Sequence, residues 1–268
     1  MRKTGGFFMN AERIAHELDT RWAGREIVLL EQTDSTNRHA RALAAQGAAH
    51  GTLVLANEQT AGRGRRGRGW ISPAGEGVFL SLILRPDVPP AQAATLSLRT
   101  ALAVAEAIRR ETGLDARIKW PNDIVVDGRK VCGMLLEMDA TAEVLHSVVA
   151  GVGINVHQMQ FDAEIARTAS SLDLLTGRRI SRSALVRAFL EEFERAAAMD
   201  DETMMRTYRA RSATLGQRVQ VIGLKETYTG TAERVTDSGT LLVRTDADGA
   251  LREVLAADVS VRGIMGYA

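Results

Sequence analysis

Residues 62–69 read Gly-Arg-Gly-Arg-Arg-Gly-Arg-Gly and are followed by Trp70. Such a run cannot contribute to a packed core, because glycine has no side chain to pack and arginine is rarely buried without a partner. The guanidinium groups offer forked hydrogen-bond donors that suit phosphate or carboxylate. The run therefore predicts a loop that is mobile when empty and closes over an anionic ligand.

Three alternatives compete with a ligand-binding loop. A dense basic run can be a solvated surface loop. Gly62, Gly64 and Gly67 also spell the dinucleotide fingerprint G-x-G-x-x-G, but that fingerprint requires a helix to begin at its third glycine. Residues 68–73 (Arg-Gly-Trp-Ile-Ser-Pro) cannot begin a helix. A nucleic-acid-binding arginine/glycine segment is disfavoured because the run is short and lies between two strand-like stretches.

The charge balance makes this basic run a local feature. The chain of 268 residues has 34 Lys and Arg against 33 Asp and Glu, a formal net charge of +1. No global field therefore draws it to nucleic acid or a membrane surface. No apolar stretch of about 18 residues and no signal-peptide pattern occur, so we expect a soluble, cytoplasmic protein.

Cysteine and histidine usage narrows the chemistry further. The single cysteine, Cys132, excludes an internal disulfide and suits a reducing compartment. Its apolar neighbours favour a small buried core residue over a reactive thiol. The five histidines are scattered without metal-ligand spacing, which disfavours a dedicated zinc site.

The apolar pattern divides the chain into three parts. Residues 1–25 are expected to form a short leader with one amphipathic turn near 14–18, too small for a supported helix-turn-helix. Residues 26–213 are expected to form an α+β domain with a mainly antiparallel sheet and flanking helices. Residues 214–268 carry short alternating strands with glycine turns and are expected to form a small β-barrel.

Individual elements follow from the same patterns. Helices are expected to end near 46 and to span about 91–112, 181–198 and 201–210. Asp34–Asn37 offer side chains that could cap the first of these helices. Asp127-Gly128 between β-branched runs predicts a hairpin turn. Strands are expected at 27–30, 52–57, 77–84, 124–126, 131–138, 145–156, 218–221, 228–235, 241–243 and 259–261.

Lys119-Trp-Pro-Asn-Asp123 is the second distinctive segment. Pro121 restricts Trp120 to extended backbone, which predicts that Lys119 lies at a rigid strand edge. A lysine held there can stabilise charge that develops on a phosphate or an activated carboxylate. A lone lysine is more often a surface residue, so this hypothesis depends on the arginine-rich loop elsewhere in the chain.

Two further segments, Gly133–Glu137 and Gly151–Val156, contain glycines within strand-like runs. Glycine in a strand allows a ligand or another backbone to approach closely. Asn155 could read a base edge or could cap the end of a strand, and spacing alone leaves both open. Gln59-Thr60 could equally be an exposed polar turn.

Taken in order, these segments resemble the motifs of the biotin protein ligases, in the branch that lacks an N-terminal DNA-binding domain. The resemblance runs from about residue 27 to the C-terminus. Each motif is weak alone, but the ordered set is specific. The resemblance implies the fold shared with class II aminoacyl-tRNA synthetases, followed by an SH3-like barrel. The motifs are Asp34-Ser-Thr-Asn37, Gln59-Thr60, residues 62–70, residues 119–123, Gly133-x-Leu-x-Glu137 and Gly151-x-Gly-x-Asn-Val156.

The resemblance implies a two-step acyl transfer. Biotin's carboxylate would attack the α-phosphate of ATP to give biotinyl-5′-AMP and pyrophosphate. The amine of one lysine on a biotin carboxyl carrier protein, from acetyl-CoA carboxylase or a related carboxylase, would then attack the mixed anhydride. Mg²⁺ is expected to travel with the ATP phosphates and to be held by few protein carboxylates. No specific DNA binding and no membrane partner are expected.

The resemblance also implies a role for each site residue. Lys119 would be the main catalytic residue, with Arg65 as the second, and no dedicated metal ligands are assigned. The ureido ring of biotin would bind Ser35, Thr36, Gln59 and backbone near Arg65, and its apolar tail would lie near Gly133 and Leu135. The phosphates would bind Arg63, Arg65, Arg68 and Lys119, and adenine would bind Trp70 and Asn155. The implied ligand-binding set is completed by Asn37, Gly64 and Gly153.

Three rival hypotheses remain. A lipoate–protein ligase shares the expected fold, but its substrate has no ureido ring for Gln59 and the arginine-rich loop to bind. A biotin-responsive repressor would require a DNA-binding domain that the short leader does not provide. A non-catalytic sensor of biotin or nucleotide is disfavoured by the presence of Lys119.

Overall fold

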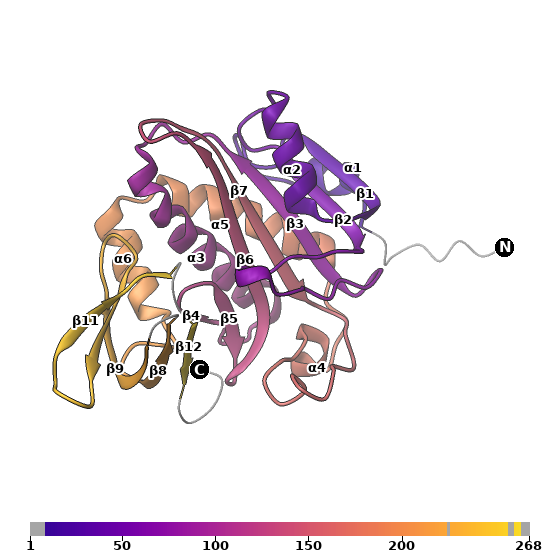
Figure 1. The fold of residues 1–268 in the computed structure, drawn as a ribbon. Coiled ribbons are helices and arrows are strands. Elements are labelled where there is room, and N and C mark those ends of the chain that lie inside the picture. Colours follow the sequence, from indigo (N-terminus) through magenta and orange to yellow (C-terminus); the bar gives the residue numbers. More distant parts are fainter. Residues whose placement is uncertain (1–8, 224–225, 257–259, 264–268) are drawn as a thin grey trace.

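The computed structural model describes residues 9–223, 226–256 and 260–263. Its main domain is built on a seven-stranded sheet with the order β1-β2-β3-β7-β6-β5-β4 (Figure 1). β1 runs parallel to β2, whereas the other neighbouring pairs in this sheet are antiparallel. The strands are β1 (Ile27–Thr33), β2 (Leu53–Gln59), β3 (Gly77–Leu84), β4 (Arg117–Lys119), β5 (Asp123–Val126), β6 (Arg129–Ala140) and β7 (Leu145–Asn155).

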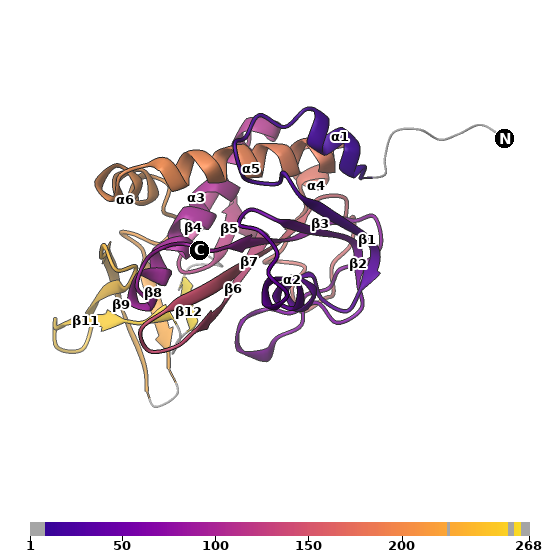
Figure 2. The same ribbon diagram turned by 90° about the horizontal axis from the view of Figure 1, so that it is seen from above.

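Helices cover the two faces of this sheet unequally. The long helices α3 (Ala93–Thr112) and α5 (Arg182–Ala198) lie on one face, together with α1 (Ala11–His16) and α6 (Asp201–Ala210), whereas α2 (Thr36–Ala45) lies on the other (Figure 2). A further short helix, α4, spans Leu172–Thr176. The main core lies between the sheet and α3 and α5, because their apolar faces have no other surface to cover. The α2 face is left open enough to hold a site.

A second, smaller sheet follows α6. Its five strands have the order β11-β10-β9-β8-β12, and the neighbouring pairs are antiparallel. They are β8 (Arg218–Ile222), β9 (Thr227–Val235), β10 (Leu241–Thr245), β11 (Leu251–Val254) and β12 (Ser260–Gly263). The predicted fold class is confirmed: a mixed α+β domain with a mostly antiparallel sheet and a small C-terminal β domain.

Residues 9–25, which the sequence suggests are a leader, are built into the core. Ile14 on α1 is fully buried, and Leu18 and Ala23 are buried with it in the main core. The Glu194 carboxylate on α5 accepts hydrogen bonds from the backbone N–H groups of Arg21, Trp22 and Ala23. The described part of the segment is thus packed structure rather than an appended leader.

Several local predictions are confirmed by the backbone. The hairpin turn between β5 and β6 has positive φ at both Asp127 (49°) and Gly128 (71°), as a two-residue hairpin loop requires. Helix α3 ends at Gly113, which adopts the left-handed conformation expected of a C-terminal glycine. Cys132 is fully buried, and burial raises the pKa of its thiol, which fits a core residue.

Other elements differ from the expectation. β1 continues past Leu30 through three more residues, and α3 is preceded by a 3-10 turn (Pro90–Gln92) rather than beginning at 91. The sequence patterns did not identify β4, α4 or β11, which are too short to show a period. The last predicted strand, 259–261, begins at Val259, which lies outside the described residues.

Candidate functional site

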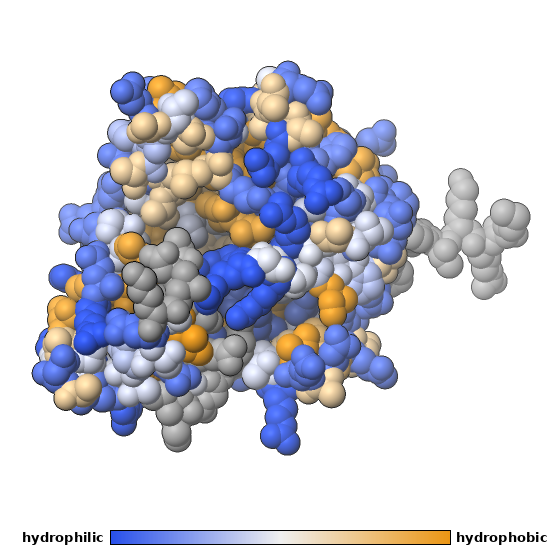
Figure 3. All heavy atoms as spheres, viewed as in Figure 1, coloured by the Kyte–Doolittle hydropathy of each residue, from blue (hydrophilic) through white to orange (hydrophobic). Residues whose placement is uncertain are grey.

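A cavity of about 920 Å³ opens on the α2 face of the main sheet. It is bounded by the loop between β2 and β3, the start of α2, the strands β6 and β7, the segment 119–123 and residues 158–169. Hydrophilic side chains gather over the middle of this face (Figure 3), where the β2–β3 loop crosses β6 (Figure 1). Every residue that the sequence suggested for ligand binding lines this one cavity.

Residues 62–69, hereafter the arginine loop, form a closed turn. Trp70 N–H donates to the carbonyl of Gly62 at 2.9 Å, and Gly64 N–H donates to the carbonyl of Arg68 at 2.7 Å. Arg66 and Gly67 at the tip both have positive φ, of 58° and 72°. These backbone hydrogen bonds lie within the loop and its first flanking residue. The arginine side chains make the contacts with the rest of the protein.

The start of α2 is capped from another strand. Ser35 is the N-cap residue, but its side chain makes no capping hydrogen bond, contrary to the expectation for Asp34–Asn37. Instead Gln59 Oε1 accepts from the backbone N–H of Thr36 at 2.9 Å and from its hydroxyl at 3.1 Å. Gln59 Nε2 donates to Ser72 Oγ at 2.8 Å, just beyond the arginine loop. Gln59 thus joins α2 to that loop and is not an exposed turn.

A second set of hydrogen bonds is centred on the side chain of Asn37, which is only 5% exposed. Its amide Nδ2 donates to the carbonyl of Leu135 and to Glu137 Oε2, and its Oδ1 accepts from Ser81 Oγ. The side chain fits only because position 151 is glycine, where a Cβ would lie 2.0 Å from Asn37 Oδ1. This glycine is required by close contact, as the sequence predicted for the 151–156 segment.

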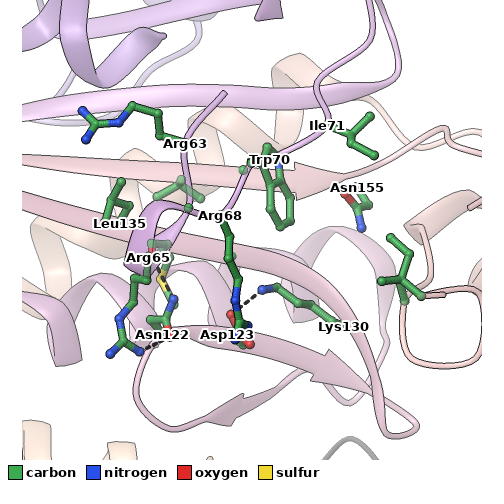
Figure 4. Close-up of a pocket in the computed structure, with 18 of the residues that line it drawn as sticks. Arg63, Arg65, Arg68, Trp70, Ile71, Asn122, Asp123, Lys130, Leu135 and Asn155 are labelled. Carbon is green, nitrogen blue, oxygen red and sulfur yellow. Dashed lines mark hydrogen bonds and ion pairs between the residues drawn. The ribbon is translucent and has the colours of Figure 1, made fainter. Parts of the chain in front are cut away.

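Trp70 lies flat across the middle of the sheet. A Cβ at Gly153 would lie 2.4 Å from its Nε1, and a Cβ at Gly133 would lie 2.9 Å from its ring. The Lys130 ammonium lies 5.2 Å from the centre of the ring, and the indole N–H is buried without a hydrogen-bond partner in the described structure. Trp70 and Asn155 project from neighbouring segments into one part of the cavity (Figure 4).

Lys119 ends β4 and is 5% exposed. The next residue, Trp120, fixes the position of this segment against the C-terminal domain. Its backbone N–H donates to Thr214 Oγ1 and its indole N–H donates to the carbonyl of Gly239, both at 2.9 Å. The Trp120–Pro121 peptide bond is cis. Lys119 thus lies at the end of an edge strand, as predicted, and the C-terminal domain contacts the residue that follows it.

Arg65 connects the arginine loop to the same segment. Its Nη1 donates to Asn122 Oδ1 at 2.8 Å, and its Nη2 donates to the carbonyl of Ala256 in the C-terminal domain. Burial is the main cause of a lowered pKa for this guanidinium, with Arg66 and Arg68 adding to it. Asn122 Nδ2 in turn donates to the carbonyl of Met134 on β6. Arg65 therefore lies where loop, lysine segment and C-terminal domain meet.

The cavity carries an excess of positive charge. Within it, the Lys130 ammonium forms an ion pair with the Asp123 carboxylate at 2.6 Å (Figure 4). Lys119 is buried and Arg65 and Lys130 are half-buried, so their attraction for an anionic ligand is screened less by water than that of the exposed arginines. The cationic lining residues are Arg63, Arg65, Arg66, Arg68, Lys119, Lys130 and Arg167, and the acidic ones are Asp123, Asp162 and Glu164.

Comparison with known proteins places this geometry in a family. Residues 29–155 match the model of the biotin/lipoate A/B protein ligase family, and residues 214–262 match that of the biotin protein ligase C-terminal domain. A biotin–[acetyl-CoA-carboxylase] ligase from Paracoccus denitrificans is 36% identical over 239 residues, covering 85% of this chain and 97% of that protein. The chain belongs to the biotin protein ligase family.

Other similar proteins are also named as ligases. The bifunctional ligase/repressor BirA of Bacillus subtilis is 34% identical over 259 residues, which cover 94% of this chain and 79% of that protein. A biotin protein ligase from Aquifex aeolicus, solved with biotin and ATP, superposes with a TM-score of 0.74 at 27% identity, covering 89% of this chain and 99% of that one. The predicted enzyme class, a biotin protein ligase, is confirmed, and the lipoate alternative is not favoured by these names.

Some residues that shape this ligase site were not predicted. Asn122, Asp123 and Glu137 lie within recognised motifs but were assigned no role, and only their contacts reveal one. Lys130 and residues 158–169 carried no motif, since they reach the cavity through tertiary packing alone. None of the helices in the described part of the chain is long and apolar enough to span a membrane.

Proposed function

We propose that Lys119 is the main catalytic residue of this biotin protein ligase and that Arg65 assists it. The observation that carries this proposal is that Lys119 is buried at the end of a clamped strand, in a cavity shared with Arg65 and Arg68. An ammonium held in a partly dry site stabilises developing negative charge without having to reorganise. Such a lysine suits a reaction between two anions, a carboxylate and a phosphate.

In the first step, an oxygen of the biotin carboxylate attacks the α-phosphorus of ATP. A carbon–oxygen–phosphorus anhydride forms, the bond to the bridging oxygen of the β-phosphate breaks, and pyrophosphate leaves. Lys119 would bridge the carboxylate and the α-phosphate, while Arg65 and Arg68 would bind phosphate oxygens. Bringing two like-charged reactants together is the main barrier, so positioning and charge neutralisation supply most of the catalysis.

In the second step, the neutral amine of an acceptor lysine attacks the acyl carbon of biotinyl-5′-AMP. The amide bond forms, the nitrogen loses one proton to solvent, the acyl–oxygen bond breaks, and AMP leaves with the charge again facing Lys119. The closed arginine loop would keep water away from the anhydride in the meantime. We propose that Ser35, Thr36, Asn37 and Gln59 bind the ureido end of biotin, because all four are polar residues that line the cavity.

The other proposed contacts, with the biotin tail and with adenine, involve residues on and above β6 and β7. The biotin tail would lie near Gly133 and Leu135, which line the cavity. Trp70 and Asn155, which both line the cavity, would hold the adenine by stacking and by hydrogen bonding to its edge. Gly64 and Gly153 would allow the close backbone approach that these contacts need.

Mg²⁺ would accompany the ATP phosphates. This ion prefers oxygen ligands and is usually held by substrate phosphates, waters and one or two carboxylates. Asp123, Asp162 and Glu164 line the cavity, but no three such side chains cluster as a metal site in the described part of the chain, so the phosphates and waters would supply most of the ligands. When bound, the ion would neutralise the leaving pyrophosphate. Asp123, positioned by Lys130, is the carboxylate we propose to hold it.

We propose a biotin carboxyl carrier protein of acetyl-CoA carboxylase as the acceptor, because the Paracoccus denitrificans relative and one from Mycobacterium tuberculosis are named for that substrate. The second of these is 36% identical over 88% of both chains. We also propose that the chain works in the cytoplasm and binds no specific DNA. A gel-shift experiment with operator DNA at physiological salt tests the latter, and sequence-specific retardation would contradict it.

The decisive experiment replaces Lys119 by alanine and, as a shape-matched control, by methionine. Pyrophosphate release with biotin and ATP should fall by about a hundredfold or more in both variants, the scale seen when one preorganised charge stabiliser is removed. Thermal denaturation of both variants shows whether a loss of activity comes with a loss of folding. Wild-type pyrophosphate release in either variant would contradict the role of Lys119.

A further inference from the structure

Glu137 on β6 occupies an unusual position between the arginine loop and α2. Its side chain is 16% exposed and accepts from three groups on two other elements. Oε2 accepts from Asn37 Nδ2 at 2.9 Å, and Oε1 lies 3.2 Å from Arg63 Nη1 and 3.5 Å from Arg41 Nη1. Asn37 and Arg41 belong to α2, whereas Arg63 belongs to the arginine loop.

Arg63 points in a different direction from the other arginines of the loop. In Figure 4 it extends away from Arg65, Arg68 and the Lys130–Asp123 pair. Arg65 is held by Asn122 and by the C-terminal domain. The loop is therefore fastened on two sides, by Arg65 at the lysine segment and by Arg63 at the Glu137 carboxylate. The first contact involves neutral acceptors, and the second is an ion pair.

We infer that Glu137 is a positioning residue that holds the arginine loop closed through Arg63. The carboxylate is suited to this because Glu137 is paired with Val149 of β7 and Asn37 fixes one of its oxygens. The partly buried carboxylate then presents its other oxygen to the loop. Opening the loop on this side costs the ion pair with Arg63, while the hydrogen bond to Asn37 can persist.

The consequence for catalysis rests on the proposed function. If the loop keeps biotinyl-5′-AMP from water and from stray amines, loosening its Arg63 side should release adenylate before the acceptor arrives. Arg63 would then act mainly on retention of the intermediate, through Glu137, rather than on the phosphates. Its ion pair with Glu137 and its direction away from Arg65 and Arg68 favour this over a phosphate contact.

Trypsin tests the loop directly, without relying on ligase activity. The loop offers cleavage sites after Arg63, Arg65, Arg66 and Arg68, and a closed hairpin protects them. We expect cleavage within residues 63–68 to be up to about fivefold faster in Glu137→Gln and Arg63→Ala, the scale of a partly exposed ion pair. The double variant should be cleaved no faster than the faster single one, because both remove the same contact.

Two matched variants separate this role from a general loss of structure. Arg41→Ala removes the other cation near the same carboxylate without touching the loop, so its cleavage should match wild type. Arg63→Lys keeps a cation and a trypsin site and should restore most of the protection. Wild-type cleavage in Glu137→Gln and Arg63→Ala would overturn the inference. Faster cleavage in Glu137→Gln alone would also overturn it, since the carboxylate would then act through Asn37.

The effect on the reaction is measured separately, as biotin attached to the lysines of serum albumin in the absence of an acceptor. Glu137→Gln and Arg63→Ala should label albumin more per pyrophosphate released than wild type and Arg41→Ala do. Equal labelling despite faster cleavage would overturn the link between the loop contact and adenylate retention. If wild type itself releases no pyrophosphate, the proposed function fails while the cleavage result still tests the loop contact.

Discussion

The indole of Trp70 rests directly on the backbone of Gly153, so closely that a Cβ there would lie 2.4 Å from Nε1. Gly153 pairs across the sheet with Gly133, whose Cβ would also meet the ring. Two adjacent strands thus leave out their side chains at one level and form a platform for one aromatic residue. Neither glycine has a positive φ, so contact rather than backbone conformation requires them.

Replacing Gly153 by alanine should therefore displace Trp70. We expect ATP affinity to fall by about tenfold, within the range that base–aromatic stacking contributes, with little loss of thermal stability. The measurement is calorimetric titration with a non-hydrolysable ATP analogue. In a Trp70→Ala background the same glycine substitution should have almost no further effect, because the ring it displaces is gone. Fully additive losses would show that Gly153 acts independently of Trp70.

The hydrogen bond between Trp120, which follows Lys119, and Thr214 of the C-terminal domain gives a second prediction. Thr214 is 2% exposed and its hydroxyl accepts from the backbone N–H of Trp120. Thr214→Val keeps the shape but leaves this buried N–H unpaired, so unfolding free energy should fall by about 1–3 kcal/mol. Urea denaturation measures the loss. Thr214→Ser keeps the hydroxyl and should lose less, and an equal loss in both would contradict this explanation.

Much of the fold could be predicted because its signals are local. The apolar run of β3, the glycine after α3 and the Asp127-Gly128 turn each determine their structure within a few residues. Elements made by tertiary contact could not be predicted. The three-residue strand β4 depends on pairing with β5 and on backbone bonds to residues 211–213. The packing of Ile14 and Leu18 against the core likewise leaves no local pattern.

The site was predictable to the extent that its residues stand in motifs. All the predicted ligand-binding residues line one cavity, but their connections were not visible in the sequence. Gln59 was predicted to bind the ureido ring, with an exposed turn as the alternative, and the structure shows that its side chain also caps α2 from a neighbouring strand. Glu137 closes a motif, yet its role depends on Arg63, which is 74 residues away. The spacing of motifs along the sequence indicates which residues belong to the site, but it does not indicate which atoms are in contact.

The packing of residues 21–23 against α5 supplies a third prediction. Glu194 accepts hydrogen bonds from three successive backbone N–H groups, those of Arg21, Trp22 and Ala23. Although burial acts to raise the pKa of this carboxyl, the backbone donors lower it below its ordinary value of 4.5. Glu194→Ala should reduce unfolding free energy by about 1–3 kcal/mol, since the donors lose their partner.

Glu194→Gln, which retains a neutral acceptor, should lose less than Glu194→Ala in the same urea titration. The stabilisation by the carboxylate is present above its unfolded pKa and is lost as pH falls through the lower folded value. The difference between wild type and Glu194→Gln should therefore shrink on acidification below 4.5. A difference that stays constant into that range would mean that charge has no part in the contact.

His157 supplies a pH dependence closer to neutrality. It is 2% exposed, and its Nδ1 lies 2.8 Å from Asp173 Oδ2. Burial lowers the pKa of His157 below the ordinary 6.5, although the hydrogen bond to Asp173 opposes the shift. The unfolded chain therefore binds this proton more readily than the folded one. The unfolding free energy should not depend on His157 well above pH 6.5. It should decrease as the pH falls from 6.5 towards the pKa of His157 in the folded protein.

Substitution of His157 by glutamine, which can still donate to Asp173, removes this titration. Between about pH 7.5 and about pH 5.5, wild type should lose more unfolding free energy than His157→Gln does. Some pH dependence will remain in the variant, because burial also lowers the pKa of His50; a variant with both histidines replaced should be flatter still. If wild type and His157→Gln lose equal stability, the folded protein takes up the proton as readily as the unfolded chain, and the Asp173 contact fully offsets burial.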